Sequence, residues 1–121
     1  MAKTILIVED DEMSMKLVTD LLHARGYDTL HSVDGMDTLQ LAKKHHPDLI
    51  LMDIQLPEIS GIEHVKMLKA DDALKDIPVV AITAFAMRGD EETILEAGCD
   101  GYIAKPISIS QFLETVANFI K

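Results

Sequence analysis

The chain has 121 residues, a formal net charge of −10 and 48% apolar residues, which suits one domain with a proper hydrophobic core. Its acidity disfavours partners with phosphate backbones or anionic surfaces, so we expect neither a nucleic-acid nor a membrane partner. The chain shows no signal-peptide pattern and no apolar stretch near the roughly 20 residues that cross a bilayer, so it is predicted to be cytoplasmic.

Strand-like apolar runs alternate with helix-like segments five times along the chain. In chain order we predict strand 4–9, helix 12–25, strand 28–32, helix 36–45, strand 48–53, helix 61–69, strand 77–82, helix 87–97, strand 100–104 and helix 109–120. Strict alternation predicts an α/β fold in which helices cover both faces of a parallel sheet. The second strand is the poorest in apolar residues, so we expect it near an edge of the sheet.

The residues that flank the predicted helices support these boundaries. Gly26 and Gly98 each follow a predicted helix, where glycine favours the left-handed backbone that ends it. Ser60 and Ser108 precede helices and have Glu or Gln three residues further on, which is the pattern of a capping box.

Polar residues follow the predicted strands at their carboxyl ends. Asp53 comes directly after four apolar residues, and Glu9 and Asp10 close the first strand. Thr83 follows the fourth strand and Lys105 the fifth. Open α/β sheets bind their ligands at the edge where the carboxyl ends of the strands meet. We therefore expect these five side chains to surround one site.

The three acids of this group predict a metal site. Glu9, Asp10 and Asp53 would repel one another unless a proton or a cation binds. Mg²⁺ suits the group, because it is a hard ion held by one or two carboxylates, a carbonyl and several waters. A carboxylate beside a bound metal can attack phosphorus and become an aspartyl phosphate. Lys105 and Thr83 would then bind the phosphoryl oxygens.

Four segments together resemble the receiver domains of two-component response regulators. They are Val8–Asp11, Leu51–Pro57, Ile82–Ala84 and Tyr102–Pro106. The resemblance covers essentially the whole chain. It implies a flavodoxin-like fold, a doubly wound five-stranded parallel sheet with strand order 2-1-3-4-5 and five helices. The stretch 83–90 is similar to that of stand-alone receivers, with no output domain, that act in bacterial cell-cycle control.

The resemblance implies a phosphoacceptor and its metal ligands. Asp53 would be the phosphoacceptor. Asp10, Glu9 and the Gln55 carbonyl would hold Mg²⁺ together with Asp53. Many receivers have aspartate where this chain has Glu9, and the extra methylene implies contact with the metal through water.

The resemblance also implies a switch. Thr83 would move toward the phosphoryl group, and Tyr102 would be the aromatic side chain that turns inward when Thr83 moves. Lys105 would pair with the phosphoryl group, and the bond from Lys105 to Pro106 would be cis.

One receiver domain over residues 1–121, with no output domain, is the domain organisation that the resemblance implies. Its partner would be a histidine kinase or a histidine phosphotransfer protein, and phosphorylation would switch a protein-binding face. The chain would be a phosphoacceptor switch that assists its own phosphorylation and dephosphorylation and not an enzyme acting on other substrates. We expect a monomer or a weak dimer.

Three other functions stay open at this point. A receiver with the same site could relay phosphate to a histidine phosphotransfer protein. A magnesium-dependent phosphatase of the haloacid-dehalogenase kind also uses a strand-end Asp, but it normally has a second acid two residues on, where this chain has Gln55. A dinucleotide-binding module would need G-x-G-x-x-G after the first strand, and the chain lacks this motif.

The cysteine and the histidines predict no further site. Cys99 is the single cysteine, so it cannot close an internal disulfide and is expected to be a small packed residue. No Cys or His falls at the strand ends, which argues against zinc. The histidines at 23, 31 and 64 lack metal-ligand spacing.

Overall fold

The computed structural model describes residues 3–9, 11–32, 37–53, 61–83, 95–104 and 107–120. The strands are β1 (Thr4–Val8), β2 (Asp28–Ser32), β3 (Leu49–Asp53), β4 (Val79–Thr83) and β5 (Gly101–Ala104). The helices within these residues are α1 (Glu12–Ala24), α2 (Thr38–His45), α3 (Gly61–Ala70) and α5 (Ile109–Phe119). Most of the helix predicted over 87–97 lies outside the described residues.

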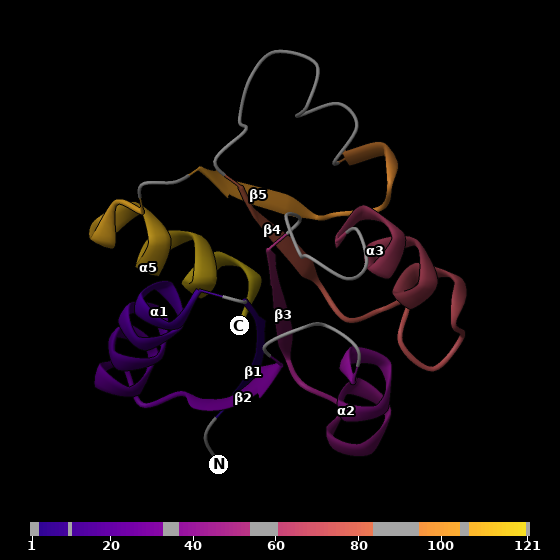
Figure 1. Cartoon of the computed structure of the whole chain (residues 1–121), viewed down its shortest axis with the longest axis horizontal. Coiled ribbons are helices and arrows are strands. Elements are labelled where there is room, and N and C mark those ends of the chain that lie inside the picture. Colours follow the sequence, from indigo (N-terminus) through magenta and orange to yellow (C-terminus); the bar gives the residue numbers. More distant parts are fainter. Residues whose placement is uncertain are drawn as a thin grey trace.

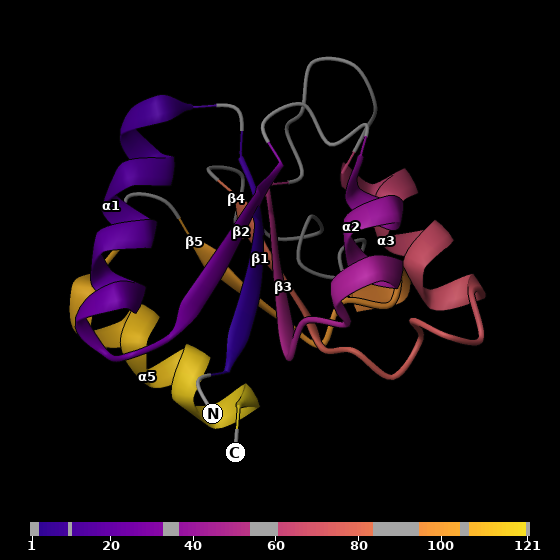
Figure 2. The ribbon, with the colours of Figure 1, turned by 90° about the horizontal axis from the view of Figure 1, so that it is seen from below.

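The strands form one parallel sheet in the order β2-β1-β3-β4-β5, so the predicted strand order is confirmed. β2 lies at an edge of the sheet, as we predicted from its small number of apolar residues. Helices α1 and α5 cover one face of the sheet, and α2 and α3 cover the other (Figure 1, Figure 2). Because all the strands are parallel, their carboxyl ends lie together at one end of the sheet.

Successive residues of the central strands enter two separate cores, because side chains alternate between the faces of a sheet. All five residues of β3 are buried. Ile50 and Met52 pack in the core under α2 and α3, whereas Leu49 and Leu51 pack in the core under α1 and α5. The four consecutive apolar residues of β3 thus have the two-sided burial that the sequence predicted.

Both glycines predicted to end helices have left-handed backbone. Gly26 has a φ of 85°, and its N–H donates to the His23 carbonyl at 3.0 Å. The next N–H, of Tyr27, donates to the Leu22 carbonyl at 3.1 Å, which completes a Schellman motif. Gly98 has a φ of 113°. These predictions are confirmed.

The structure describes only one of the two predicted capping boxes, and it contradicts that one. Ser108 occupies the N-cap of α5, but its side chain makes no capping hydrogen bond, so the box predicted there is wrong. Ser60 lies outside the described residues. α1 is capped by Asp11, whose Oδ2 accepts hydrogen bonds from the N–H and the hydroxyl of Ser14 at 3.3 Å and 2.7 Å.

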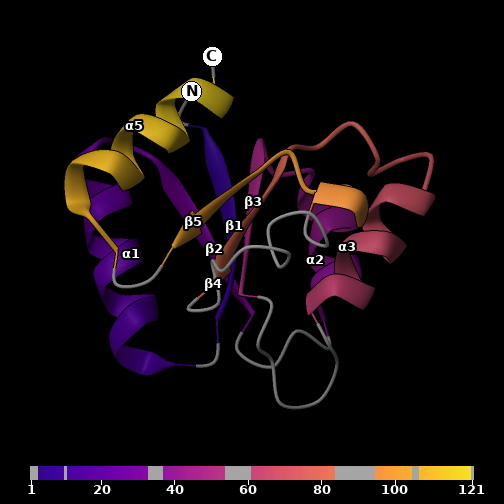
Figure 3. The same cartoon turned by 90° about the horizontal axis from the view of Figure 1, so that it is seen from above.

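A lysine clamp joins α3 to the amino-terminal ends of β4 and β5. Lys69 Nζ donates to the carbonyls of Lys75 and Ile77 at 3.2 Å and 3.0 Å. It also donates to Asp100 Oδ2 at 2.9 Å, and the same oxygen accepts the Val79 N–H at 2.8 Å. Figure 3 shows α3 beside the segment that enters β5. The strand predicted over 77–82 therefore starts at Val79, after a turn that the clamp holds.

Candidate functional site

Two acids lie side by side at the carboxyl edge of the sheet. Val8 of β1 pairs with Met52 of β3, and the next residue of each chain segment is an acid, Glu9 or Asp53. The parallel register of two neighbouring strands therefore brings these carboxylates together, although 43 other residues separate them in sequence. Both are 2% exposed.

The neighbouring strands bring two more candidates to the same edge. Asp53 lies opposite Ile82 of β4, which Thr83 follows. Thr83 pairs with Ala104, the last residue of β5 and the one that precedes Lys105 in sequence. Of Thr83 only the backbone is described.

Tyr102 lies on β5 two residues before Ala104. It pairs with Ala81 of β4 and is partly buried against the core under α2 and α3. Its ring therefore belongs to the face of the sheet opposite α1 and α5. The inward turn predicted for Tyr102 stays a prediction.

The backbone holds Glu9 firmly in this position. Its N–H donates to the Ser32 carbonyl at 3.0 Å, which continues the pairing of β1 with β2. Its Oε1 accepts the Asp11 N–H at 3.2 Å. Asp11, an acid of the same run, serves as the cap of α1.

A polar cluster behind Glu9 escaped the sequence reasoning. The Ser32 hydroxyl donates to Asp37 Oδ1, and it lies 3.5 Å from the Thr38 hydroxyl. Ser32 and Thr38 are 1% and 0% exposed. The cluster ties the end of β2 to the start of α2, next to the carbonyl that holds Glu9. Hydroxyl residues at a strand end and at the next helix start were its signal in the sequence.

The described acids suit a hard divalent cation. Two buried carboxylates at adjacent strand ends carry like charges in a place where water cannot screen them well, and a cation relieves this cost. Carboxylate oxygens are the donors that Mg²⁺ prefers, and it needs only one or two of them. Among the described residues no group of three or more His, Cys, Asp or Glu side chains could hold a metal. The fit to Mg²⁺ therefore rests on Glu9 and Asp53.

Four predicted site residues lie outside the described residues. They are Asp10, Gln55, Lys105 and Pro106. Their roles as metal ligands, phosphoryl ligand and cis-proline stay predictions.

Cys99 is packed inside the protein, as predicted. It is 6% exposed in the core under α2 and α3. Burial, together with the nearby Asp100 carboxylate, raises the pKa of the Cys99 thiol from 9.0 to about 11. The thiol is therefore neutral at physiological pH and is a poor nucleophile.

The raised pKa of Cys99 predicts a loss of stability in alkali. In the unfolded chain the thiol ionises near pH 9, whereas the folded protein retains the proton until about pH 11. The stabilisation is complete below pH 9 and disappears as pH rises toward 11, with about 1 kcal/mol lost by pH 10. Urea unfolding at pH 8 and pH 10 should show a smaller decrease for Cys99→Ala than for wild type. Equal decreases would contradict this assignment.

The sheet order and the paired acids at its carboxyl edge are those of a receiver, and the family comparison agrees. The model of the response regulator receiver domain matches residues 5–117. The chain belongs to this family, the receivers of two-component signalling, as its four segments predicted. Within the family it is similar to the polar-differentiation response regulator DivK of Brucella ovis, with 56% identity over 120 residues. The match covers 99% of this chain and 98% of that protein, and DivK of Brucella anthropi matches equally well. Stretch 83–90 predicted a relative of this kind.

Solved structures share the fold over nearly the whole chain. A putative response regulator of Chloroflexus aurantiacus has a TM-score of 0.94 and 28% identity, and the match covers 99% of this chain and 98% of that one. The receiver domain of a Pseudomonas aeruginosa sensor histidine kinase has a TM-score of 0.91 and 30% identity with the same coverage. That receiver holds a magnesium ion in its active site cleft. In the part of our chain that the structure describes, no helix is long and apolar enough to cross a membrane.

Proposed function

We propose that this chain is a phosphorylation switch in which Asp53 accepts a phosphoryl group from a histidine kinase or a histidine phosphotransfer protein. The observation that carries the proposal is the burial of Asp53 beside Glu9 at the carboxyl end of the central strand. Two neighbouring buried carboxylates repel each other, and a bound cation relieves this repulsion. Membership of the receiver family supports the same conclusion.

The transfer would form one bond and break one. An Asp53 oxygen attacks phosphorus while the bond between phosphorus and the donor imidazole breaks, and the imidazole nitrogen keeps the electron pair and takes up a proton. Asp53, Glu9, Asp10 and the Gln55 carbonyl would hold Mg²⁺. The bound cation supplies charge that offsets the repulsion between the carboxylate and the phosphoryl group.

The switch would follow from new contacts to the phosphoryl group. Lys105 and Thr83 would bind its oxygens, and Tyr102 would turn inward as Thr83 moves. Such contacts bias an equilibrium between two conformations that already exists. The output would leave through the face formed by 87–97, β5 and α5, within one receiver domain spanning 1–121.

The relatives suggest the pathway. At 56% identity to a polar-differentiation regulator, the chain is proposed to act in the control of cell polarity and the cell cycle. The histidine kinase or phosphotransfer protein of that pathway would be its partner. A cytoplasmic location stays a prediction from composition.

The chemical test uses acetyl phosphate as a small phosphodonor. With Mg²⁺ the chain should gain one phosphoryl group, seen by intact-protein mass, that survives acid and is lost in base. Removal of the metal with EDTA should prevent the gain. Labelling that is equally strong in EDTA, or that resists base, would contradict an aspartyl phosphate formed with a metal.

A further inference from the structure

Two histidines from different elements come together where α1 packs on the edge strand β2. His23 lies in the last turn of α1, and His31 lies on β2. Thr29 lies between them, because its Oγ1 is 3.0 Å from His23 Nε2 and 3.1 Å from His31 Nε2. The two Nε2 atoms are therefore no farther apart than the sum of these distances, about 6 Å. We call His23 and His31 the histidine pair.

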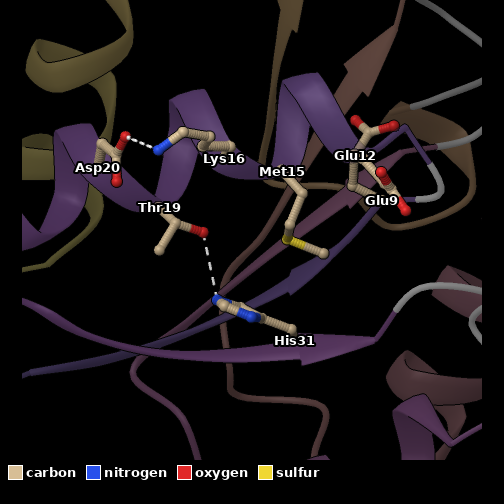
Figure 4. Close-up of a pocket in the computed structure, with 7 residues that line it drawn as sticks. All are labelled: Glu9, Glu12, Met15, Lys16, Thr19, Asp20 and His31. Atoms are coloured by element: carbon tan, nitrogen blue, oxygen red, sulfur yellow. Dashed lines mark hydrogen bonds and ion pairs between the residues drawn. The ribbon is translucent and has the colours of Figure 1, made fainter.

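The pair is a product of packing. His31 follows His23 by eight positions, which matches no local spacing of metal ligands. Residues i and i+4 share a face of a helix, and residues i and i+2 share a face of a strand. Thr19 and His23 of α1 therefore lie over Thr29 and His31 of β2. The Thr19 hydroxyl is 3.2 Å from His31 Nε2, and Figure 4 shows these two side chains facing each other.

The two threonine hydroxyls can hold both rings with a lone pair turned toward the space between them. A neutral imidazole carries its proton on one nitrogen and a lone pair on the other, and each hydroxyl has one proton to donate. Thr29 can donate to His23 Nε2 while Thr19 donates to His31 Nε2, and both rings then keep their own proton on Nδ1. In this arrangement two unprotonated nitrogens face one small region, as two ligands of a metal ion do.

Imidazole nitrogen selects the kind of ion. Zn²⁺, Cu²⁺ and Ni²⁺ bind imidazole well, whereas Mg²⁺ prefers oxygen. Bonds of about 2.0–2.1 Å to one tetrahedral Zn²⁺ place two nitrogens roughly 3.3 Å apart. Both rings are exposed, and the terminal torsion of histidine is broad, so rotation can bring the nitrogens to this separation. Among the residues that the structure describes, no third His, Cys, Asp or Glu completes a metal site with the pair, so water would fill the other positions.

We propose that His23 and His31 together bind one divalent transition-metal ion, such as Zn²⁺, between α1 and β2. The ion would replace the two hydroxyl protons as the partner of the Nε2 lone pairs. The formal net charge of −10 favours the approach of cations. Two imidazoles select a different ion from the carboxylates of Glu9 and Asp53, so this site is additional to the magnesium site. Bound metal would join α1 to the edge strand and stabilise the folded chain by mass action.

The first test is a Zn²⁺ titration of the whole ¹⁵N-labelled chain in excess Mg²⁺, which keeps the carboxylate site occupied. Long-range ¹H–¹⁵N spectra report each imidazole nitrogen separately. The Nε2 signals of His23 and His31 should shift along one saturable binding curve, whereas the ring signals of His45 and His46 should not follow that curve. Absence of a saturable shift at either member of the pair would overturn the proposal.

Matched variants separate the pair from the other histidines. His23→Gln and His31→Gln each remove one ligand, and His45→Gln removes an exposed histidine of α2, across the sheet from α1 (Figure 2). Each of the first two should weaken Zn²⁺ binding at the remaining ring by about tenfold or more, because a chelate becomes a single contact. His45→Gln should leave the affinity of the pair unchanged. Equal effects of the three variants, or undiminished binding after loss of one ligand, would overturn the proposal. All three positions are exposed, and thermal melts in EDTA check that the variants fold like wild type.

Discussion

Asp53→Asn should abolish labelling of the chain by acetyl phosphate while its thermal stability stays equal to or above that of wild type. The neutral amide keeps the shape of the side chain but is no nucleophile for phosphorus. Asp53 is 2% exposed and follows Met52, the partner of the residue before Glu9, so loss of its charge also lowers the repulsion between neighbouring acids. Intact-protein mass reports the phosphoryl group, and a thermal melt reports the fold.

A surface acid provides the matched control. The Asp72 side chain is 98% exposed, and it pairs with Lys75 Nζ at 3.5 Å. Asp72→Asn should therefore be labelled like wild type. Undiminished labelling of Asp53→Asn would place the phosphoacceptor at another residue, and a large fall in its melting temperature would assign Asp53 a structural role.

Lys69→Met should lower the free energy of unfolding by about 2–3 kcal/mol, or the melting temperature by roughly 10 °C. Methionine keeps the length of the stem but cannot donate to Lys75, Ile77 and Asp100. The Lys69 side chain is 20% exposed, so water replaces these bonds poorly. Urea unfolding at neutral pH measures the change.

The control for the clamp is Lys75→Met. Lys75 Nζ reaches Asp72 at 3.5 Å and its side chain is 52% exposed, so the variant should lose less than about 1 kcal/mol. The Lys69→Met variant should still be phosphorylated. The clamp lies at the amino-terminal ends of β4 and β5, whereas Asp53 lies at the carboxyl end of β3. If the two methionine variants are equally stable, the clamp contributes no more than an ordinary surface pair.

The part of the fold that depends on local spacing was predictable. Alternating strand and helix patterns led to the parallel sheet, and four consecutive apolar residues placed β3 between two layers of helices. Gly26 and Gly98 marked the ends of helices. The left-handed backbone that ends a helix depends only on residues a few positions apart, so it could be predicted. The place of Asp53 at the end of β3 was predictable for the same reason, because an acid directly after four apolar residues is an unusual local pattern.

Side-chain partners were harder to predict, even close in sequence. The pattern at Ser108 predicted a capping hydrogen bond, but the side chain makes none. Asp11 could have been a metal ligand by its place in an acidic run, yet its carboxylate caps α1. A pattern of residue types limits which bonds are possible, but the rotamer adopted in the packed protein selects among them.

Tertiary structure alone decided the contacts between distant residues. Lys69 and Asp100 are 31 positions apart, and no local pattern connects them. They meet because α3 packs beside the ends of β4 and β5. Thr19 of α1 likewise meets His31 of the edge strand β2, at 3.2 Å, because α1 lies across that strand. The sequence by itself determined the layers of the sheet and the acid at its carboxyl end. Packing determined the lysine clamp and the contact between α1 and β2, because only packing sets the distance between separate elements.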